Sequence, residues 1–387
     1  MKTAFLAAEC IGVEGRLRNA VVVVEDGVVM SVRARQQTAV PSAASVVDLG
    51  DGLLVPGFID MHIHGGAGHD VMEGTPEGIA VLELHLARHG TTSYCPTTVS
   101  APVDTTLRAL EHLADEIEAV AKRDTHALRA RPLGVHLEGP FISKQKAGAQ
   151  PLECITEASV ESFNRLWQAA RGHVKVITIA PEIAGAEAVI REAASRGVCV
   201  SLGHSNATLE ETRRGIAAGG RHVTHLFNAM RQLDHREPGI AGCALVEDSV
   251  SAEMIVDGVH VSPEVVKLFL KAKGNRGVLV TDAISATGMP DGRYQLGGFE
   301  VEVKGDVCMS HGKLAGSVLT LDRAVRNVMK FTGITLDTAL QMVTVSPARA
   351  LRLYGRKGVI EPGADADFVL LTADGQVCRT IVAGVSG

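Results

Sequence analysis

Two histidines stand two positions apart in the segment "DMHIHGG", at residues 60–66. They follow the apolar run "LLVPGFI" (53–59), whose composition fits a buried strand. Positions two apart in a strand point to the same face, so the rings of His62 and His64 would lie side by side where the strand opens into a glycine loop. Such a pair can bind a metal ion, although an isolated pair is more often a polar strand end.

Titratable residues also end five later strand-like runs. They are Glu138 in "PLGVHLEGP", His204 in "VCVSLGHS", His225 in "HVTHLFNAM", His260 in "IVDGVH" and Asp282 in "GVLVTDA". One such residue would mean little, but six strand ends with titratable groups favour a common site over chance. In a barrel of parallel strands, all these ends would meet on one face.

One carboxylate and two imidazoles, from Glu138, His204 and His225, supply three metal ligands and leave a fourth position for water, as in catalytic zinc sites. Zinc fits these ligands, and Fe, Co and Mn also occupy such sites. The metal would lower the pKa of the water, and Asp282 is the natural general base and acid. Taken singly, these residues are equally compatible with structural roles, such as a hydrogen-bonded core histidine or a helix N-cap at Asp282.

The elements that must position these residues alternate along the chain. Strand-like runs lie near 53–60, 91–97, 132–138, 174–180, 198–204, 222–227, 252–257 and 277–283. Amphipathic, helix-like segments lie at 76–89, 106–123, 183–196, 208–218, 262–273, 320–332 and 336–352. This pattern predicts an α/β protein with a (β/α)8 TIM barrel. A doubly wound sheet fits less well because no glycine-rich phosphate loop follows the first strand.

Both ends of the chain have a different, β-rich pattern. The segment "NAVVVVEDGVVMSVRA" (19–34) predicts a hairpin that turns at Asp26-Gly27, and residues 358–384 alternate strand-like runs with Gly/Asp turns. Each terminal segment is too small to fold alone. We therefore expect residues 1–54 and 355–387 to form one small β domain beside a barrel of residues 55–354.

Composition narrows the function classes. The 387 residues are 46% hydrophobic and carry a formal net charge of −6, with scattered basic residues that do not suggest nucleic-acid binding. The seven cysteines form no CxxC pair, which is typical of buried thiols in a reducing compartment. No uncharged run is long enough to span a membrane, and Glu9 interrupts the apolar start too early for a signal peptide. We expect a cytoplasmic globular protein.

The motifs "PGFIDMHIHG", "HLEGPF", "GHS", "THLFNAM", "HREPG", "DGVH", "TDA" and "LAGS", in this order, resemble the N-acetylglucosamine-6-phosphate deacetylases of the amidohydrolase superfamily. The likeness covers nearly the whole chain, including the terminal "GADADFVLL". It implies a barrel with a small β-sandwich from both termini. It also implies hydrolysis of the acetamide of N-acetylglucosamine 6-phosphate to glucosamine 6-phosphate and acetate, usually by a homodimer whose neighbouring chain helps to close the site.

Carried over by motif, the resemblance makes Glu138, His204 and His225 the ligands of one essential metal and Asp282 the acid/base. It places the substrate phosphate near Asn228 and the Ala229 backbone amide, with Arg236 as its charged partner and His260 on the sugar. Arginine suits that task because its donors pair with phosphate oxygens.

Two departures from the family pattern affect the site. Some members lack the first-strand HxH and use one metal, whereas His62 and His64 here would be ligands of a second metal bridged by Glu138. The family commonly has a histidine in a "KGAH"-like loop, and this chain has Gln150 in "KAGAQP". A glutamine can donate a hydrogen bond to a developing oxyanion but cannot become cationic.

Two alternatives stay open at this point. The chain could be a related amidohydrolase that acts on N-acetylgalactosamine 6-phosphate or another N-acyl amino sugar phosphate. It could instead be a non-catalytic relative, but retention of the metal-ligand set and Asp282 argues against that reading. The C4-epimer preference depends on small differences in the pocket that motifs do not reveal.

Overall fold

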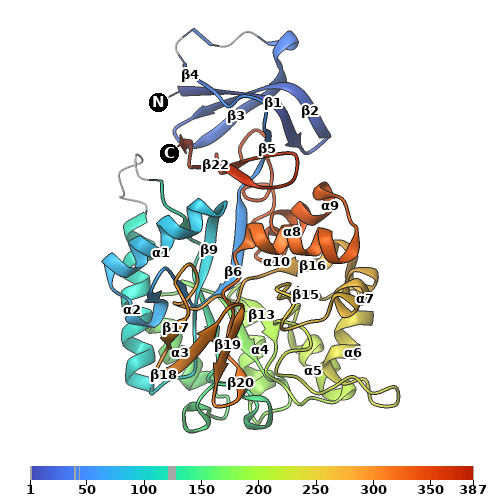
Figure 1. Cartoon of the computed structure of the whole chain (residues 1–387). Coiled ribbons are helices and arrows are strands. Elements are labelled where there is room, and N and C mark those ends of the chain that lie inside the picture. The colour runs from blue at the N-terminus through green and yellow to red at the C-terminus, as the bar shows by residue number, and fades with distance from the viewer. Residues whose placement is uncertain (1, 39–40, 43, 121–127, 387) are drawn as a thin grey trace.

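The computed structural model describes residues 2–38, 41–42, 44–120 and 128–386. Residues 1, 39–40, 43 and 387 of the expected small domain, and 121–123 of an expected helix, lie outside the described residues. Figure 1 shows a barrel surrounded by helices, with a separate sheet at one end that holds both chain termini. No helix within the described ranges is both long enough and apolar enough to cross a bilayer.

All eight predicted barrel strands are present and pair in parallel around the barrel. They are β6 (Phe58–Ile63), β9 (Thr91–Thr98), β11 (Val135–Glu138), β12 (Val174–Ile179), β13 (Cys199–Leu202), β14 (His222–Val223), β15 (Ser251–Met254) and β16 (Gly277–Leu279). A parallel bridge between Ile63 and Ala283 joins the ends of the first and last strands. The TIM barrel is therefore confirmed.

Buried Asp60, which precedes the two histidines in "DMHIH", strengthens this closure. Its Oδ2 accepts a hydrogen bond from Thr281 Oγ1 at 2.6 Å, and its Oδ1 accepts from the His62 N–H at 3.3 Å. Burial raises the pKa of Asp60 to about 7. This carboxyl group connects the first strand to the segment that carries Asp282.

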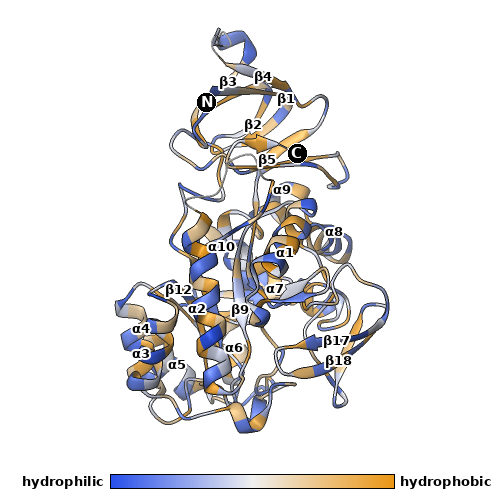
Figure 2. Ribbon diagram, turned by 90° about the vertical axis from the view of Figure 1, so that its left-hand side faces the viewer, coloured by the Kyte–Doolittle hydropathy of each residue, from blue (hydrophilic) through white to orange (hydrophobic). Residues whose placement is uncertain are grey.

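The helices follow the predicted alternation. They are α1 (Pro76–Arg88), α2 (Val103–Val120), α3 (Val160–Ala169), α4 (Ala186–Ser195), α5 (Leu209–Ala218), α6 (Gly239–Val246), α7 (Pro263–Lys273), α8 (Leu321–Thr332), α9 (Leu336–Gln341) and α10 (Val345–Ala350). Figure 2 shows hydrophilic and hydrophobic residues along α2, which buries its apolar face. The expected helix over 336–352 is in fact two helices, α9 and α10. Two helices were not predicted, α3 and α6, and α6 has no polar face because most of it is buried.

The small sheet contains strands from both ends of the chain. Its strands are β1 (Lys2–Gly12), β2 (Gly15–Glu25), β3 (Val28–Ala34), β4 (Ser45–Asp48), β5 (Leu53–Pro56), β21 (Phe368–Leu371), β22 (Val377–Val382) and β23 (Val385–Ser386). Asp26 and Gly27 have φ values of 49° and 79°, as the predicted hairpin turn requires. The rings of Phe5 and Phe368 pack edge to face across the two chain ends, with centroids 5.9 Å apart. This sheet fits the expected β-sandwich.

The expected first barrel strand, 53–60, is divided between the two parts of the fold. Leu53–Pro56 pairs with β21 in the small sheet, whereas Phe58 starts the barrel. The chain passes from one to the other at Gly57, where an added Cβ would lie only 2.1 Å from Thr92 Oγ1. A glycine is needed at this crossing because there is no room for a side chain.

A further antiparallel sheet after the last barrel strand was not predicted. It comprises β17 (Gly292–Leu296), β18 (Phe299–Lys304), β19 (Val307–Ser310) and β20 (Lys313–Leu314). Its apolar face packs with Val99 and Ile284, which follow barrel strands. We call it the cover sheet, because Leu296, Phe299 and Lys313 line the cavity described below.

The remaining elements are short. They are β7 (Gly65–Gly66), β8 (His69–Asp70), β10 (Arg131–Pro132), η1 (Arg35–Gln37), η2 (Val71–Glu73), η3 (Lys144–Lys146), η4 (Leu152–Cys154) and η5 (Gly274–Arg276). The cysteines are free thiols, and all are buried except half-buried Cys154 and exposed Cys378.

The carboxylates of the "GADADF" motif hold a buried lysine between the barrel and the small sheet. Lys357 Nζ lies 3.0 Å from Asp365 Oδ2 and also bonds Asp367. Replacing Lys357 with Met leaves the buried Asp367 without its cation, whereas Asp365 keeps Arg356, so we expect a loss of about 3–5 kcal/mol in the free energy of unfolding. Denaturant titration checks this value. An R191A variant, which breaks the exposed pair with Glu187, should cost less than about 1 kcal/mol.

Candidate active site

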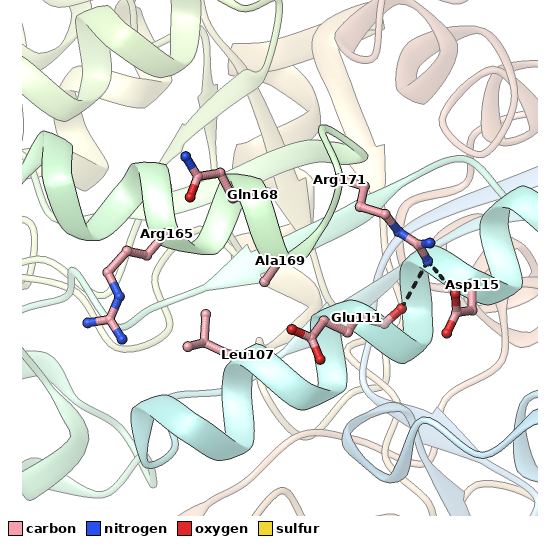
Figure 3. A pocket seen from close by; sticks show the side chains of 7 residues that line it. All are labelled: Leu107, Glu111, Asp115, Arg165, Gln168, Ala169 and Arg171. Atoms are coloured by element: carbon pink, nitrogen blue, oxygen red, sulfur yellow. Dashed lines mark hydrogen bonds and ion pairs between the residues drawn. The ribbon is translucent and has the colours of Figure 1, made fainter.

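A cavity of about 320 Å³ lies at the carboxyl ends of the barrel strands, beneath the cover sheet. Nine residues singled out from the sequence line it, namely His64, Glu138, Gln150, His204, His225, Asn228, Ala229, His260 and Asp282. A larger cleft, of about 480 Å³, lies between α2 and α3 (Figure 3). There Arg171 bonds Asp115 Oδ1 at 2.5 Å and the Glu111 carbonyl at 3.3 Å. The seven lining residues include none of the three buried clusters of histidines and carboxylates that could hold a metal ion. The chemistry therefore belongs to the smaller cavity.

Glu138, His204 and His225 converge as the sequence predicted. Glu138 Oε1 lies 3.0 Å from His204 Nε2 and 3.2 Å from His225 Nε2. The two Nε2 atoms are 3.1 Å apart, and all three residues are buried. A carboxylate oxygen and two ring nitrogens thus face a common point.

His62, His64 and Asp282 form an adjoining group. His64 Nε2 lies 3.0 Å from Asp282 Oδ1 and 3.3 Å from His62 Nε2. Glu138 connects the groups, because its Oε1 is 3.4 Å from His62 Nε2 and its Oε2 is 3.5 Å from His64 Nε2. The paired histidines of the first strand therefore reach the same carboxylate as His204 and His225.

The hydrogen bonds behind the rings determine which nitrogen faces this centre. His64 Nδ1 lies 3.0 Å from the Thr97 carbonyl oxygen, and His204 Nδ1 lies 3.0 Å from the Lys146 carbonyl oxygen. A carbonyl only accepts, so each Nδ1 carries a hydrogen and each ring turns its Nε2 towards Glu138. Ring nitrogens and carboxylate oxygens at these distances need positive charge between them, from ring protons or from a metal ion. The donor set fits a divalent metal such as Zn, Fe, Co or Mn.

The electrostatics of the site favour positive charge. Burial lowers the pKa of His62, but the charges of Glu253, Glu138 and Asp282 outweigh it and raise that pKa well above its usual value. Burial raises the pKa of Glu138, but the neighbouring histidines His204 and His62 outweigh it and keep that pKa well below its usual value. The carboxylates of this buried centre therefore remain ionised.

The backbone at the site is strained. His204, His225, Ala229 and Asp282 have positive φ values of 48°, 24°, 49° and 50°. Such conformations are unusual for non-glycine residues and concentrate at functional sites. At Asp282 the strained segment is held on both sides, since its N–H donates to the His62 carbonyl at 2.9 Å and its carbonyl accepts from the Ser317 N–H at 2.7 Å.

Gln150 lies in the cavity, but its side chain already binds Glu138. Its Nε2 donates to Glu138 Oε2 at 2.8 Å, while its Oε1 accepts from the Ser100 N–H at 2.9 Å. The amide thus orients the carboxylate that both groups share. Only one amide hydrogen remains for the predicted contact to an oxyanion.

The predicted sugar and phosphate contacts lie on two loops at the cavity. His260 is half-buried, and its Nδ1 lies 2.6 Å from Asp257 Oδ2. Phe227 and Ala229 have positive φ values and flank Asn228, which does not. The Asn228 N–H donates to the His225 carbonyl at 3.0 Å, so the Ala229 N–H is the backbone donor left for the predicted phosphate contact.

Arg236 is not brought to the cavity of this chain. It is exposed, and its backbone N–H bonds Asp234 Oδ1 in the loop that follows β14. The basic side chain that does line the cavity is Lys313 of the cover sheet, whose Nζ donates to the Gly148 carbonyl at 3.0 Å. A Cβ built on Gly148 would lie 3.7 Å from the Ala229 Cβ, so this ammonium group is near the Asn228–Ala229 segment.

Sequence reasoning missed Lys313 and Glu253. Lys313 directly precedes the quoted "LAGS" motif, and the glycine turns between 292 and 314 are a hairpin signal that could have located its sheet. Glu253 stands within the apolar run "SAEMIV", where an acidic residue is itself a signal, because carboxylates are rarely buried without a partner.

Replacing a ligand should remove the metal. We expect H204A to retain less than about a tenth of the tightly bound divalent metal of the wild type, since one of three donors is lost. Elemental analysis after dialysis against a weak chelator measures the metal content. The matched control is H173A, whose imidazole lies outside the barrel mouth beside Glu118. Equal metal contents in H204A and the wild type would contradict the assignment.

Comparison with known proteins agrees with this geometry. Residues 53–386 match the model of the amidohydrolase family. The chain is 41% identical over 334 residues to N-acetylglucosamine-6-phosphate deacetylase of Lysinibacillus sphaericus, covering 86% of this chain and 84% of that protein. It is 39% identical over 359 residues to N-acetylgalactosamine-6-phosphate deacetylase of Escherichia coli O157:H7, covering 92% of each.

Solved structures show the same relationship. The crystal structure of N-acetylglucosamine-6-phosphate deacetylase from Thermotoga maritima superposes with a TM-score of 0.86 at 36% identity, covering 100% of this chain and 99% of that one. A mutant of the Mycobacterium smegmatis deacetylase, in complex with N-acetyl-D-glucosamine-6-phosphate, gives a TM-score of 0.90 at 34% identity, with 100% and 99% coverage. This chain belongs to the amidohydrolase family, in the group that contains the N-acetylated amino sugar phosphate deacetylases.

Proposed function

We propose that this enzyme hydrolyses the acetamide of N-acetylglucosamine 6-phosphate to glucosamine 6-phosphate and acetate. Relatives at 36–41% identity carry that activity in their names. The observation that carries the proposal is the buried convergence of Glu138, His204 and His225 beside Asp282, at the base of a cavity large enough for a sugar. A non-catalytic relative would have no physical need for this costly arrangement of buried charge.

We propose one essential divalent metal, zinc, held by Glu138, His204 and His225. A second would be held by His62 and His64 with Glu138 shared between the two. When bound, such a metal acts as a Lewis acid and lowers the pKa of water towards neutrality. The residues of the chain perform the remaining tasks.

Asp282 is the proposed general base and acid. Its carboxylate takes a proton from the attacking water as the water oxygen bonds to the acetyl carbon. It then returns that proton to the amide nitrogen as the C–N bond breaks, which releases acetate and the amine. The backbone bonds of Asp282 to His62 and Ser317, at 2.9 Å and 2.7 Å, hold the residue in place for both transfers.

The sugar phosphate would bind between two loops and the cover sheet. The Ala229 backbone N–H would contact the phosphate, since the Asn228 N–H already donates to the His225 carbonyl, and Lys313 would supply positive charge close by. His260, held by Asp257, would contact a sugar hydroxyl. Gln150 would donate its remaining amide hydrogen to the acetyl oxygen.

We also propose that the enzyme is a cytoplasmic homodimer. Arg236 is exposed and outside the cavity of its own chain, so a phosphate contact from this residue requires a neighbouring copy. In that arrangement Arg236 would add a second positive charge to the one that Lys313 supplies within the chain.

N-acetylgalactosamine 6-phosphate is the second candidate substrate, and it differs from the first only at C4. The observation in its favour is the 39% identity to the Escherichia coli enzyme of that name, which extends over 92% of both chains. Acetate release measured on both phosphosugars, side by side, distinguishes the two candidates by their kcat/KM values.

Replacing the general base should stop turnover. We expect D282N to lower kcat at least about 100-fold, because a neutral amide cannot accept the proton, while the tightly bound metal stays in place. Acetate release and elemental analysis of the same preparation measure both quantities. D291N, which changes an exposed carboxylate on the cover sheet side, is the control. Activity of D282N within tenfold of the wild type would refute the role.

Removing the positive charges should affect phosphorylated substrates selectively. We expect K313M and R236A each to raise KM for the phosphosugar about 10- to 100-fold, as for loss of a charge-assisted hydrogen bond. Turnover of unphosphorylated N-acetylglucosamine should change less than about twofold. K304M, an exposed lysine of the same sheet, is the control. An equal loss on both substrates would show that neither residue reads the phosphate.

A further inference from the structure

Glu253 is a fully buried carboxylate on β15, beneath the cavity and not in contact with it. Its neighbours in the strand are apolar, and neither the motifs nor the proposed reaction uses it. Burying a carboxylate costs several kcal/mol unless its oxygens are satisfied. The contacts of Glu253 therefore indicate its role.

Both oxygens of Glu253 are bonded. Oε2 lies 2.9 Å from His62 Nδ1 and accepts from the His225 backbone N–H at 3.1 Å. Oε1 lies 3.2 Å from His222 Nε2, and His222 Nδ1 in turn lies 2.6 Å from Ser251 Oγ. The carboxylate thus touches one residue of each metal-ligand group and is itself held by an anchored histidine.

The contact with His62 decides how that ring is oriented. A carboxylate accepts, so Nδ1 of His62 carries a hydrogen and Nε2 faces Glu138 and Asp282, where it would offer its lone pair to a bound metal. His136, whose ring centroid is 4.6 Å from that of His62, offers no substitute, because its nitrogens bond the Met61 carbonyl and Thr178 Oγ1. Glu253 is therefore the acceptor that fixes the His62 tautomer.

We propose that Glu253 is a positioning residue that makes His62 a metal ligand, so that Glu253 controls retention of the cation held by the first-strand histidines. Carboxylates behind ligating histidines fix ring orientation and raise ligand basicity, and their loss typically lowers metal affinity 10- to 100-fold. The inference rests on the metal centre of the proposed function and is independent of which sugar is hydrolysed.

A metal titration of the whole chain tests this role. Metal-free wild type, E253M and H62A are titrated with Zn²⁺ in competition with a chelator, and circular dichroism establishes that each is folded. We expect two Zn²⁺ per wild-type chain. In E253M, affinity at the weaker site should fall 10- to 100-fold and affinity at the tighter site should change less than about threefold.

The double variant separates positioning from general support of the barrel. If Glu253 acts through His62, E253M lowers Zn²⁺ affinity no further in an H62A background, and H62A/E253M matches H62A. If E253M does not fold, E253Q takes its place in the same cycle, with a smaller loss at the weaker site. E83M, which removes another fully buried carboxylate, bonded to Arg129, is the control and should keep both sites.

Three results would overturn the inference. They are a single Zn²⁺ per wild-type chain, equal losses at both sites in E253M, and a further loss on adding E253M to H62A. A single Zn²⁺ per chain would refute the role of Glu253 but would still allow deacetylation with one metal. A protein that binds two Zn²⁺ but releases no acetate would refute the proposed function and leave the role of Glu253 unaffected.

Discussion

The buried carboxylate of Glu138 faces the Nε2 atoms of four imidazoles, and this concentration of potential metal ligands determines how the rest of the barrel mouth is built. Such a centre is stable only when positive charge occupies it and every surrounding group is held in place. Hydrogen bonds on the far side of the ligands supply that restraint. Backbone carbonyl oxygens and Glu253 bond the imidazole rings, and the Gln150 amide bonds Glu138. The strained backbone at the strand ends is tolerated because the surrounding barrel contacts hold these residues in place.

The interior of the barrel beneath the centre is polar where apolar layers are usual. His136 Nε2 lies 2.7 Å from Thr178 Oγ1, which lies 2.7 Å from Thr224 Oγ1, which lies 2.5 Å from Ser201 Oγ. Burial lowers the pKa of His136 to about 3, so this histidine stays neutral and adds no charge beneath the metal ligands. The network satisfies buried polar groups and gives the strand ends a fixed geometry.

Local patterns predicted the barrel well, because strand and helix periodicity reflects which face of each element is buried. They also predicted the convergence of Glu138, His204 and His225, since parallel strand ends meet on one face. Patterns failed where partners are distant in sequence. The position of Arg236 depends on a loop with no periodicity. The role of Glu253 depends on its contact with the His62 ring, 191 residues earlier in the chain. Lys313 was missed because its sheet crosses the barrel mouth as an insertion that the repeating β/α units do not imply.

The small sheet imposes an order on biosynthesis. Strand β5, near residue 55, pairs with β21 near residue 370, so more than three hundred residues separate two hydrogen-bonded neighbours. Contacts of such sequence separation form late, because the intervening loop must first be closed. On the ribosome, the first strands must therefore wait with an unpaired edge until the whole barrel has been translated. The nascent amino terminus is the segment for which protection by a chaperone would matter most.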